Sequence, residues 1–323
     1  MNKITERIER EAGISGLALI LAEKLSPTDL QSLLLEVYRI RSDRIQPSTV
    51  LSDFASNRFV RPSTVSPISL LRWEQIAFSL LPQEFEPIAL SPVCPFGTSS
   101  VVSQVDQNWA VTTARNTEVV SDSTNVLALE CSIRRRELLR SHPKSSNPIH
   151  LAASHRLLRA QYYKSPESIA HFSSFALCSA GKDQGNLKFE LSTLVLHVRF
   201  YLTALSAFLG PDVPLHLSIT DLGLNPRELI MAQLLSVIQS EFECVGCGFD
   251  EGRTKGRGYY SDLCFHIHAT AASGQRLELV DGGSINWTQK FLSNKKERLI
   301  ISGIGSERLC GEFGNDKPDL PRL

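Results

Sequence analysis

The stretch Arg298-Leu-Ile-Ile-Ser-Gly303-Ile-Gly305-Ser306-Glu307-Arg308-Leu309 lies near the C-terminus of this 323-residue chain. An apolar run leads into small residues, and an acidic residue and an arginine follow at once. A short apolar run of this kind is typical of a buried strand. The stretch therefore predicts a strand that turns directly into a helix, with Arg308 close to the turn.

The composition is that of an ordinary globular protein. Hydrophobic residues make up 42% and charged residues 21% of the chain. Lysine plus arginine number 34, as do aspartate plus glutamate, so the formal net charge is zero. This balance excludes a global electrostatic attraction to nucleic acid. A local basic cluster, which we interpret as a solvated helix face, is formed by Arg134, Arg135, Arg136 and Arg140.

The N-terminus and the cysteines indicate a cytoplasmic protein. The first ten residues are charged and amphipathic, and the apolar stretch 16–22 is too short to span a membrane. The seven cysteines are scattered and odd in number, which favours a reducing compartment over a disulfide framework. Cys244 and Cys247 form a CxxC pair, but no second pair follows at the spacing of a zinc site. The sequence therefore predicts no membrane segment and no metal centre.

Residues 1–68 are expected to form a small helical appendage, and residues 69–323 the main domain. Ser26 can cap a helix that Pro27 begins, and Asp29 suits the helix dipole. Apolar residues then recur at helical spacing. A polar segment with prolines, residues 42–67, is expected to be a loop.

Residues from 69 onward predict an α+β domain. Apolar residues at helical spacing predict a helix that starts at Ser69 and ends before Pro82, and residues 85–93 read as extended. Two more helices are expected over residues 189–209 and 226–242. Alternating patterns predict strands near residues 109–114, 149–153, 172–177, 215–219, 263–269, 277–280 and 299–302. Strands in separated runs with helices between them indicate an antiparallel sheet flanked by helices.

Several short motifs precede the C-terminal stretch in a set order. They are the helix and strand over 70–92, Val119-Val-Ser-Asp122-Ser-Thr124-Asn125, His155-Arg156-Leu-Leu-Arg159-Ala-Gln161 with His171–Phe175, Lys255-Gly-Arg257-Gly258-Tyr259-Tyr260-Ser261 with the strand to His266, and Leu279-Val-Asp281-Gly282-Gly283. Together they resemble the catalytic core of class II aminoacyl-tRNA synthetases, most closely the histidyl branch, over residues 70 to 310. The resemblance implies that fold, and a homodimer built on the first motif.

The resemblance also implies an amino-acid pocket. Asp122 and Thr124 match the positions that hold the ammonium group, and a buried ammonium needs such oxygen acceptors. An alternative for this segment is a loop with a helix cap at Ser123 or Thr124. The other positions that the resemblance assigns to the amino acid are Ser174, Tyr259, Tyr260, Gly282 and Gly283.

A second set of positions resembles the ATP site of the family. Arg159 matches the arginine on the α-phosphate, and Arg308 the arginine on the γ-phosphate. Lys255 stands at the position of a catalytic arginine, with Arg257 as a candidate substitute. The remaining positions that the resemblance assigns to ATP are Gln161, Phe172, Gly303 and Gly305. Mg²⁺ would be held through the phosphate oxygens.

These positions favour an ATP-dependent, amino-acid-activating protein. The chain ends soon after Arg308, so we do not expect an anticodon-binding domain or a complete tRNA synthetase. A tRNA or another carrier as acceptor stays open. Gln161, Gly258 and His266 each replace a functional family residue, which motivates an alternative function. That alternative is a non-catalytic, amino-acid-sensing subunit resembling the regulatory subunit of ATP phosphoribosyltransferase.

Overall fold

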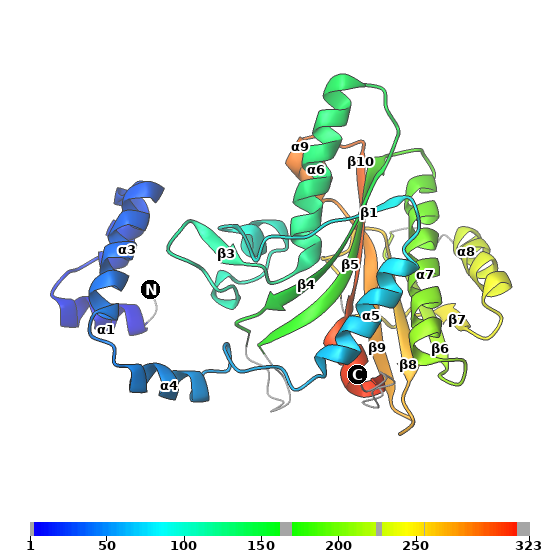
Figure 1. Ribbon diagram of the computed structural model, residues 1–323. Helices are drawn as coiled ribbons and strands as arrows, with labels where there is room; N and C mark the ends of the chain where they lie inside the picture. The colour runs from blue at the N-terminus through cyan, green and yellow to red at the C-terminus, as the bar shows by residue number, and fades with distance from the viewer. Residues whose placement is uncertain (1–2, 162–169, 224–227, 255, 315–323) are drawn as a thin grey trace.

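An eight-stranded, mostly antiparallel sheet forms the centre of the computed structural model, which describes residues 3–161, 170–223, 228–254 and 256–314 (Figure 1). The strand order is β1-β4-β5-β10-β9-β8-β6-β7, and only the β1·β4 and β6·β7 pairs at the two edges are parallel. The strands are β1 (Phe85–Pro87), β4 (Ile149–Leu158), β5 (His171–Lys182), β6 (Leu215–Asp221), β7 (Gly246–Phe249), β8 (Leu263–Thr270), β9 (Arg276–Ile285) and β10 (Glu297–Gly305).

One face of the sheet is covered along its length. The helices on this face are α5 (Pro67–Ser79), α7 (Lys188–Leu209), α8 (Glu228–Glu241) and α10 (Ser306–Phe313). Apolar side chains from these helices meet alternate residues of the strands, such as Phe175 and Leu217, in the larger core cluster. Alternation along each strand sends every second side chain to this face.

The other face is covered only in part. Helices α6 (Ser123–Ser141) and α9 (Trp287–Leu292) pack over the end of the sheet where β10 begins. Leu127 and Ala128 of α6 lie against Ile301 of β10 and Cys178 of β5 in the second core cluster. The far end of β10, which carries the two glycines of the C-terminal stretch, lies beyond these helices.

The region before α5 consists of short helices with little buried surface. It contains α1 (Lys3–Ala12), α2 (Leu17–Leu19), a π-helical turn (Ile20–Lys24), α3 (Pro27–Ser42) and α4 (Pro47–Ser56), and Figure 1 shows them beside the sheet domain. No residue of α2, α3 or α4 is buried. Asn116, in the loop before β3 (Thr117–Val119), donates to Pro27 O at 3.3 Å.

Most of the predicted elements are present. The helices over 69–81 and 189–209 correspond to α5 and α7, and Ser26 caps α3 by accepting from the Asp29 amide at 3.1 Å. The helix predicted at 226 is described from Glu228 onward, and its first residues lie outside the described part of the chain. Six of the seven predicted strands are present as β4, β5, β6, β8, β9 and β10.

Three expectations were wrong. Residues 109–114 form a short 3₁₀ turn at Gln107–Trp109 and a single bridge at Thr112 instead of a strand. The segment 42–67 contains helix α4, because Pro47 stands in the first turn, where a proline is tolerated. The extended segment after Pro82 is split into β1 and the edge strand β2 (Val93–Pro95), which pairs with β3.

The basic cluster on α6 is not a uniformly solvated face. The Arg135 side chain is fully buried and donates two hydrogen bonds of 2.8 Å to the Glu297 carboxylate on β10. Its third hydrogen bond, of 2.7 Å, goes to Asn147 O. Burying a charged group is very costly unless the group is paired and hydrogen-bonded in this way. Arg135 therefore ties α6 to the central strand.

A second buried contact joins α5 to the C-terminal stretch. Trp73 of α5 is fully buried, and its indole Nε1 donates to Ser306 Oγ at 3.1 Å. Ser306 begins α10 directly after β10. The strand-to-helix turn predicted from the sequence is thus present and is anchored to α5.

Helix α7 is long and apolar enough to cross a membrane by length and composition alone. In this fold its apolar side chains, among them Leu194, Val198 and Tyr201, are buried against the sheet and the neighbouring helices. We therefore interpret α7 as a core helix, since a helix that is apolar on most sides is typical of such a position.

Breaking the buried ion pair should destabilise the protein. In Glu297→Gln the Arg135 guanidinium stays buried without a counter-charge, which costs about 3–5 kcal/mol of unfolding free energy. Urea denaturation followed by tryptophan fluorescence measures this loss. The matched control is Glu36→Gln, which removes the exposed pair with Arg39 and should leave the denaturation curve unchanged. Equal curves for the two variants would contradict the role given to Arg135.

Candidate functional site

The open end of the sheet exposes the two glycines of β10. Gly303 and Gly305 lie on the same face as Ile301, but α6 no longer covers them. A Cβ at Gly303 would meet no atom closer than 3.8 Å, and one at Gly305 none closer than 3.7 Å. The surrounding protein therefore leaves room above both backbone positions, as a site for a flat or extended ligand requires.

Asp122, Thr124 and Arg159 come together beside this opening. Asp122 Oδ1 accepts from the Thr124 amide at 2.9 Å and from its hydroxyl at 2.8 Å, so Asp122 itself is the N-cap of α6. Its other oxygen, Oδ2, lies 3.1 Å from the Arg159 guanidinium. A helix cap is therefore present in this segment, as the alternative predicted, but the capping residue is Asp122 and not Ser123 or Thr124.

Arg159 is held from two further sides. Its Nε donates to Ser121 O at 2.8 Å, and its guanidinium lies over the Phe172 ring at 5.1 Å from the centroid. Both ion-pair partners are about one third exposed, at 35% for Arg159 and 32% for Asp122. The pair is thus accessible to a ligand. Gln161 follows on the same segment and is partly buried.

Two polar residues on neighbouring strands lie in line with Gly305. Ser174 of β5 lies opposite Gly305 in one ladder and opposite His155 of β4 in the other. The Nε2 atom of His155 is buried without a hydrogen bond from any described residue. Buried polar atoms are nearly always satisfied, so an orphaned one indicates a position for solvent or a ligand.

Tyr259 and Tyr260 line the inner wall of the site. Tyr259 is hydrogen-bonded with Thr124, and burial, followed by the nearby Asp122 charge, raises the pKa of its hydroxyl. Burial likewise raises the pKa of Tyr260, with Asp281 as the next cause. Both phenols are therefore neutral hydrogen-bonding groups at physiological pH.

Asp281, Arg253 and His266 form a polar cluster that the sequence did not predict. The Asp281 Oδ1 atom accepts from Arg253 at 2.8 Å and lies 3.2 Å from His266 Nε2. Burial alone would raise the pKa of Asp281, but the bonds from His266 and Arg253 outweigh it and hold that pKa below its usual value. Asp281 is therefore an ionised carboxylate in the same wall.

Three different segments supply this cluster, which explains why it was missed. Asp281 and His266 are opposite each other in the β8·β9 ladder, and the Arg253 side chain reaches them from the preceding loop. The Arg253 guanidinium also lies over the Tyr260 ring at 5.4 Å. Asp281 and His266 stand within the quoted motifs, whereas Arg253 stands in none of them.

Arg253 places a cation in this wall, two residues before the predicted Lys255. Arg257 is exposed, and its Nε donates to the Arg253 backbone at 2.9 Å, away from Asp281. Lys255 lies outside the described residues. Gly256 and Gly258 both have positive φ, of 81° and 85°, which is the backbone region that favours glycine. The turn alone accounts for these two glycines.

Arg308 lies at the edge of the opening. It is exposed on the first turn of α10, and its guanidinium donates to Glu278 O of β9 at 3.0 Å. Glu307 points to a different place, since its carboxylate pairs with Arg156 at 2.9 Å. Of Glu307 and Arg308, Arg308 is therefore the one beside the open face.

Packing accounts for Gly282 and Gly283 without a ligand. A Cβ at Gly282 would lie 2.5 Å from Ser302 and 2.6 Å from Phe265, on the covered face of the sheet. A Cβ at Gly283 would lie 2.5 Å from Leu263 O and 2.7 Å from the Tyr260 ring. The predicted close approach of a ligand to these glycines is therefore not needed to explain them.

The arrangement offers charges of both signs around one opening. Asp122 with Thr124 can accept hydrogen bonds from an ammonium group, and Arg159 can bind a phosphate or carboxylate oxygen. Arg308 supplies a second cation at the edge. These side chains are of the types that bind an ammonium, a carboxylate or a phosphate group.

The fold is similar to solved class II synthetase-like proteins. An ATP phosphoribosyltransferase regulatory subunit/histidyl-tRNA synthetase from Bacillus halodurans superimposes with a TM-score of 0.56 at 14% identity, over 80% of this chain and 83% of that chain. The apo histidyl-tRNA synthetase of S. aureus gives 0.56 at 15% identity, over 79% and 70%. A structure described as the RNA-binding domain of threonyl-tRNA synthetase from Cryptosporidium parvum gives 0.56 at 11% identity, over 79% and 65%.

These similarities confirm the class II synthetase-like fold that the motifs predict. No protein-family model matches the sequence, and no curated protein matches it. At 11–15% identity the structural similarity shows the fold alone.

The glycines of the two strands should respond differently to a methyl group. Gly283→Ala places its Cβ against a backbone oxygen that cannot rotate away, so we expect a loss of about 1–3 kcal/mol in unfolding free energy. Gly303→Ala has free space and should keep the wild-type stability. Chemical denaturation of both variants measures the difference. A destabilised Gly303→Ala would show that the opening above β10 is already filled by protein.

Proposed function

We propose that this protein activates an amino acid with ATP, forming an aminoacyl-adenylate and pyrophosphate. The observation that supports the proposal most is the convergence of Asp122, Thr124 and Arg159 within hydrogen-bond distance beside the uncovered glycines of β10. These are the residue types that the ammonium of an amino acid and the α-phosphate of ATP each require.

In the proposed reaction, Asp122 and Thr124 bind the ammonium and orient the amino acid. A carboxylate oxygen of the amino acid attacks the α-phosphorus, and the bond from that phosphorus to the bridging oxygen breaks. The electron pair leaves with pyrophosphate. Arg159 stabilises the charge that builds on the α-phosphate, and Arg308 binds the outer phosphates. Mg²⁺ would enter with ATP and be held through phosphate oxygens, where it would offset negative charge.

The free protein keeps the two substrate-binding groups paired with each other. When an α-phosphate binds Arg159, the ion pair between Arg159 and Asp122 is broken. The Asp122 carboxylate then lacks a counter-charge. An ammonium group supplies one. Each substrate would thus improve the site for the other, since a desolvated charge without a partner is costly. We place this activity in the cytosol, and a tRNA or another carrier would be the acceptor of the activated amino acid.

Exchange of labelled pyrophosphate into ATP, measured with each standard amino acid, tests the reaction directly. We expect exchange with one amino acid or a small chemical class of them. Arg308→Ala should abolish ATP binding with the fold intact, and Arg159→Ala should slow exchange by about 10²–10³, as loss of a transition-state donor does.

Arg140→Ala is the matched control, because it removes an exposed arginine at the far end of α6. It should change neither ATP binding nor exchange. Absence of both exchange and ATP binding would refute the proposal. A rise in melting temperature with one amino acid under those conditions would instead support the sensing subunit.

We also propose that the protein is a homodimer. An apolar hollow of about 680 Å³ lies beside residues 88–91, directly after β1, and against the outer side of α6. Its lining includes Ile88, Leu90, Val126 and Ile133, and Ile133 is 42% exposed. The hollow adjoins the helix-and-strand motif whose resemblance implies a dimer interface. A second copy of the chain is the occupant that this continuity favours.

A charge in this hollow should separate the subunits. Ile133→Glu buries an unpaired carboxylate in the proposed interface and should convert the dimer to a monomer. Light scattering coupled to size-exclusion chromatography gives the mass. Val237→Glu, at a similarly exposed position on α8, should leave the dimer intact. A wild-type monomer, or dissociation only in the control, would refute this interface.

A further inference from the structure

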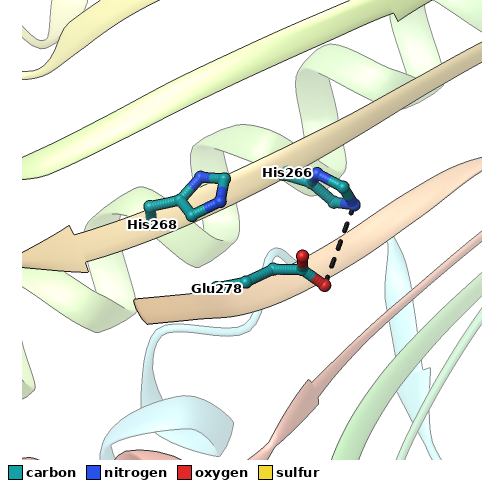
Figure 2. A group of neighbouring side chains, drawn as sticks. All are labelled: His266, His268 and Glu278. Carbon is teal, nitrogen blue, oxygen red and sulfur yellow. Dashed lines mark ion pairs between the residues drawn. The ribbon is translucent and has the colours of Figure 1, made fainter. Parts of the chain in front are cut away.

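Two histidines and a glutamate gather on the open sheet face next to Arg308. His266 and His268 alternate along β8, so both side chains project to the same face. Glu278 of β9 lies directly opposite His268 in the ladder. Figure 2 shows the two rings and the carboxylate turned toward a shared space. One ligand atom from each residue lies within 4.8 Å of the other two.

A break in the strand register creates this arrangement. The β8·β9 ladder shifts between Ile267 and His268, so His266 faces Asp281 while His268 faces Glu278. The His266 and His268 ring centroids are 5.6 Å apart, and His266 Nε2 lies 3.8 Å from the nearer Glu278 oxygen. A bulge of this kind re-aims side chains and is frequent beside functional sites.

We propose that His266, His268 and Glu278 form a binding site for a transition-metal ion, with Zn²⁺ as the ion to test. Two imidazoles and one carboxylate suit Zn²⁺ and its neighbours, whereas Mg²⁺ takes oxygen ligands. Zinc–nitrogen and zinc–oxygen bonds are about 2.0–2.2 Å long. The ligand atoms now lie within 4.8 Å of one another and would have to turn toward a common point to reach those lengths.

The surroundings support a metal site and leave one side of it open. The Asp281 carboxylate lies 3.2 Å from His266 Nε2 and is itself paired with Arg253 at 2.8 Å, so a metal ion would compete with Asp281 for this ring. Of the three ligands, His268 lines a hollow of about 410 Å³, which Arg276 and His216 also line. Three protein ligands with an open fourth position are typical of zinc ions that bind a water or a substrate oxygen. The metal would therefore accept an oxygen anion, such as a phosphate or carboxylate.

Arg276 is the group that opposes the metal. Its guanidinium lies 3.4 Å from His268 Nδ1 and 3.4 Å from Ser218 Oγ, and both contacts are long for hydrogen bonds. The site does not rest on the proposed adenylation, because its ligands are different residues. Metal binding and amino-acid activation can each hold while the other fails.

Calorimetric titration of Zn²⁺ into chelator-treated, full-length protein tests the site. The titration uses a Cys244→Ser/Cys247→Ser background, because one exposed and one half-buried thiol could bind zinc on their own. We expect one Zn²⁺ per chain. Glu278→Gln and His268→Ala should each lower the affinity for Zn²⁺ at least about tenfold, as the loss of a group at a metal site does. His142→Ala removes an exposed histidine directly after α6 and should change nothing.

X-ray absorption of the zinc-loaded protein gives an independent readout. Nitrogen and oxygen ligands should be seen at about 2.0–2.1 Å, in wild type as well as in the background variant. If His268→Ala fails to fold, Glu278→Gln carries the test, since that side chain is partly exposed. Absence of binding, sulfur ligands at about 2.3 Å in the wild type, or affinity unchanged in both variants would overturn the proposal.

Discussion

The buried ion pair between Arg135 and Glu297 determines where α6 lies on the sheet. Two hydrogen bonds of 2.8 Å hold the helix to the first residue of the central strand β10. Asp122 caps the same helix 13 residues earlier, about 20 Å away at the usual helical rise. The N-terminus of α6 therefore lies beside the end of β10, where the glycines are uncovered. This anchor helps to hold Asp122 over the open face, where it pairs with Arg159.

The site combines groups that already satisfy one another in the free protein. Asp122 pairs with Arg159, and Asp281 pairs with Arg253 and His266. Tyr259 lies between the two groups, since the charges of both aspartates contribute to its raised pKa. Such pre-formed pairs keep the site ordered without a ligand. They also mean that a ligand gains only the difference between its own contacts and those that it replaces.

Much of the fold could be predicted because its signals are local. The apolar periodicity of residues 189–209 and the apolar run before Gly303 depend only on residues close in the sequence. The helix and the strand that they predict are both present. Asp122, Thr124 and Arg159 were found through motifs, and the structure brings them together. Arg135 was misjudged, because only tertiary packing distinguishes a buried arginine from its exposed neighbours on one helix. Arg253 and Asp281 were missed because they lie 28 residues apart in the sequence, one in a loop and the other on a strand.

The hydrogen bond between Trp73 and Ser306 would couple the proposed subunit association to the proposed nucleotide binding. Trp73 belongs to the helix of the first motif, and Ser306 stands two residues before Arg308. A shift of α5 when two subunits associate would move the first turn of α10, and with it the guanidinium at the edge of the site. By thermodynamic reciprocity, a ligand that fixes Arg308 would change the association constant of the subunits by the same factor. In the proposed dimer, the indole of Trp73 would therefore be both a packing residue and a physical link between the two equilibria.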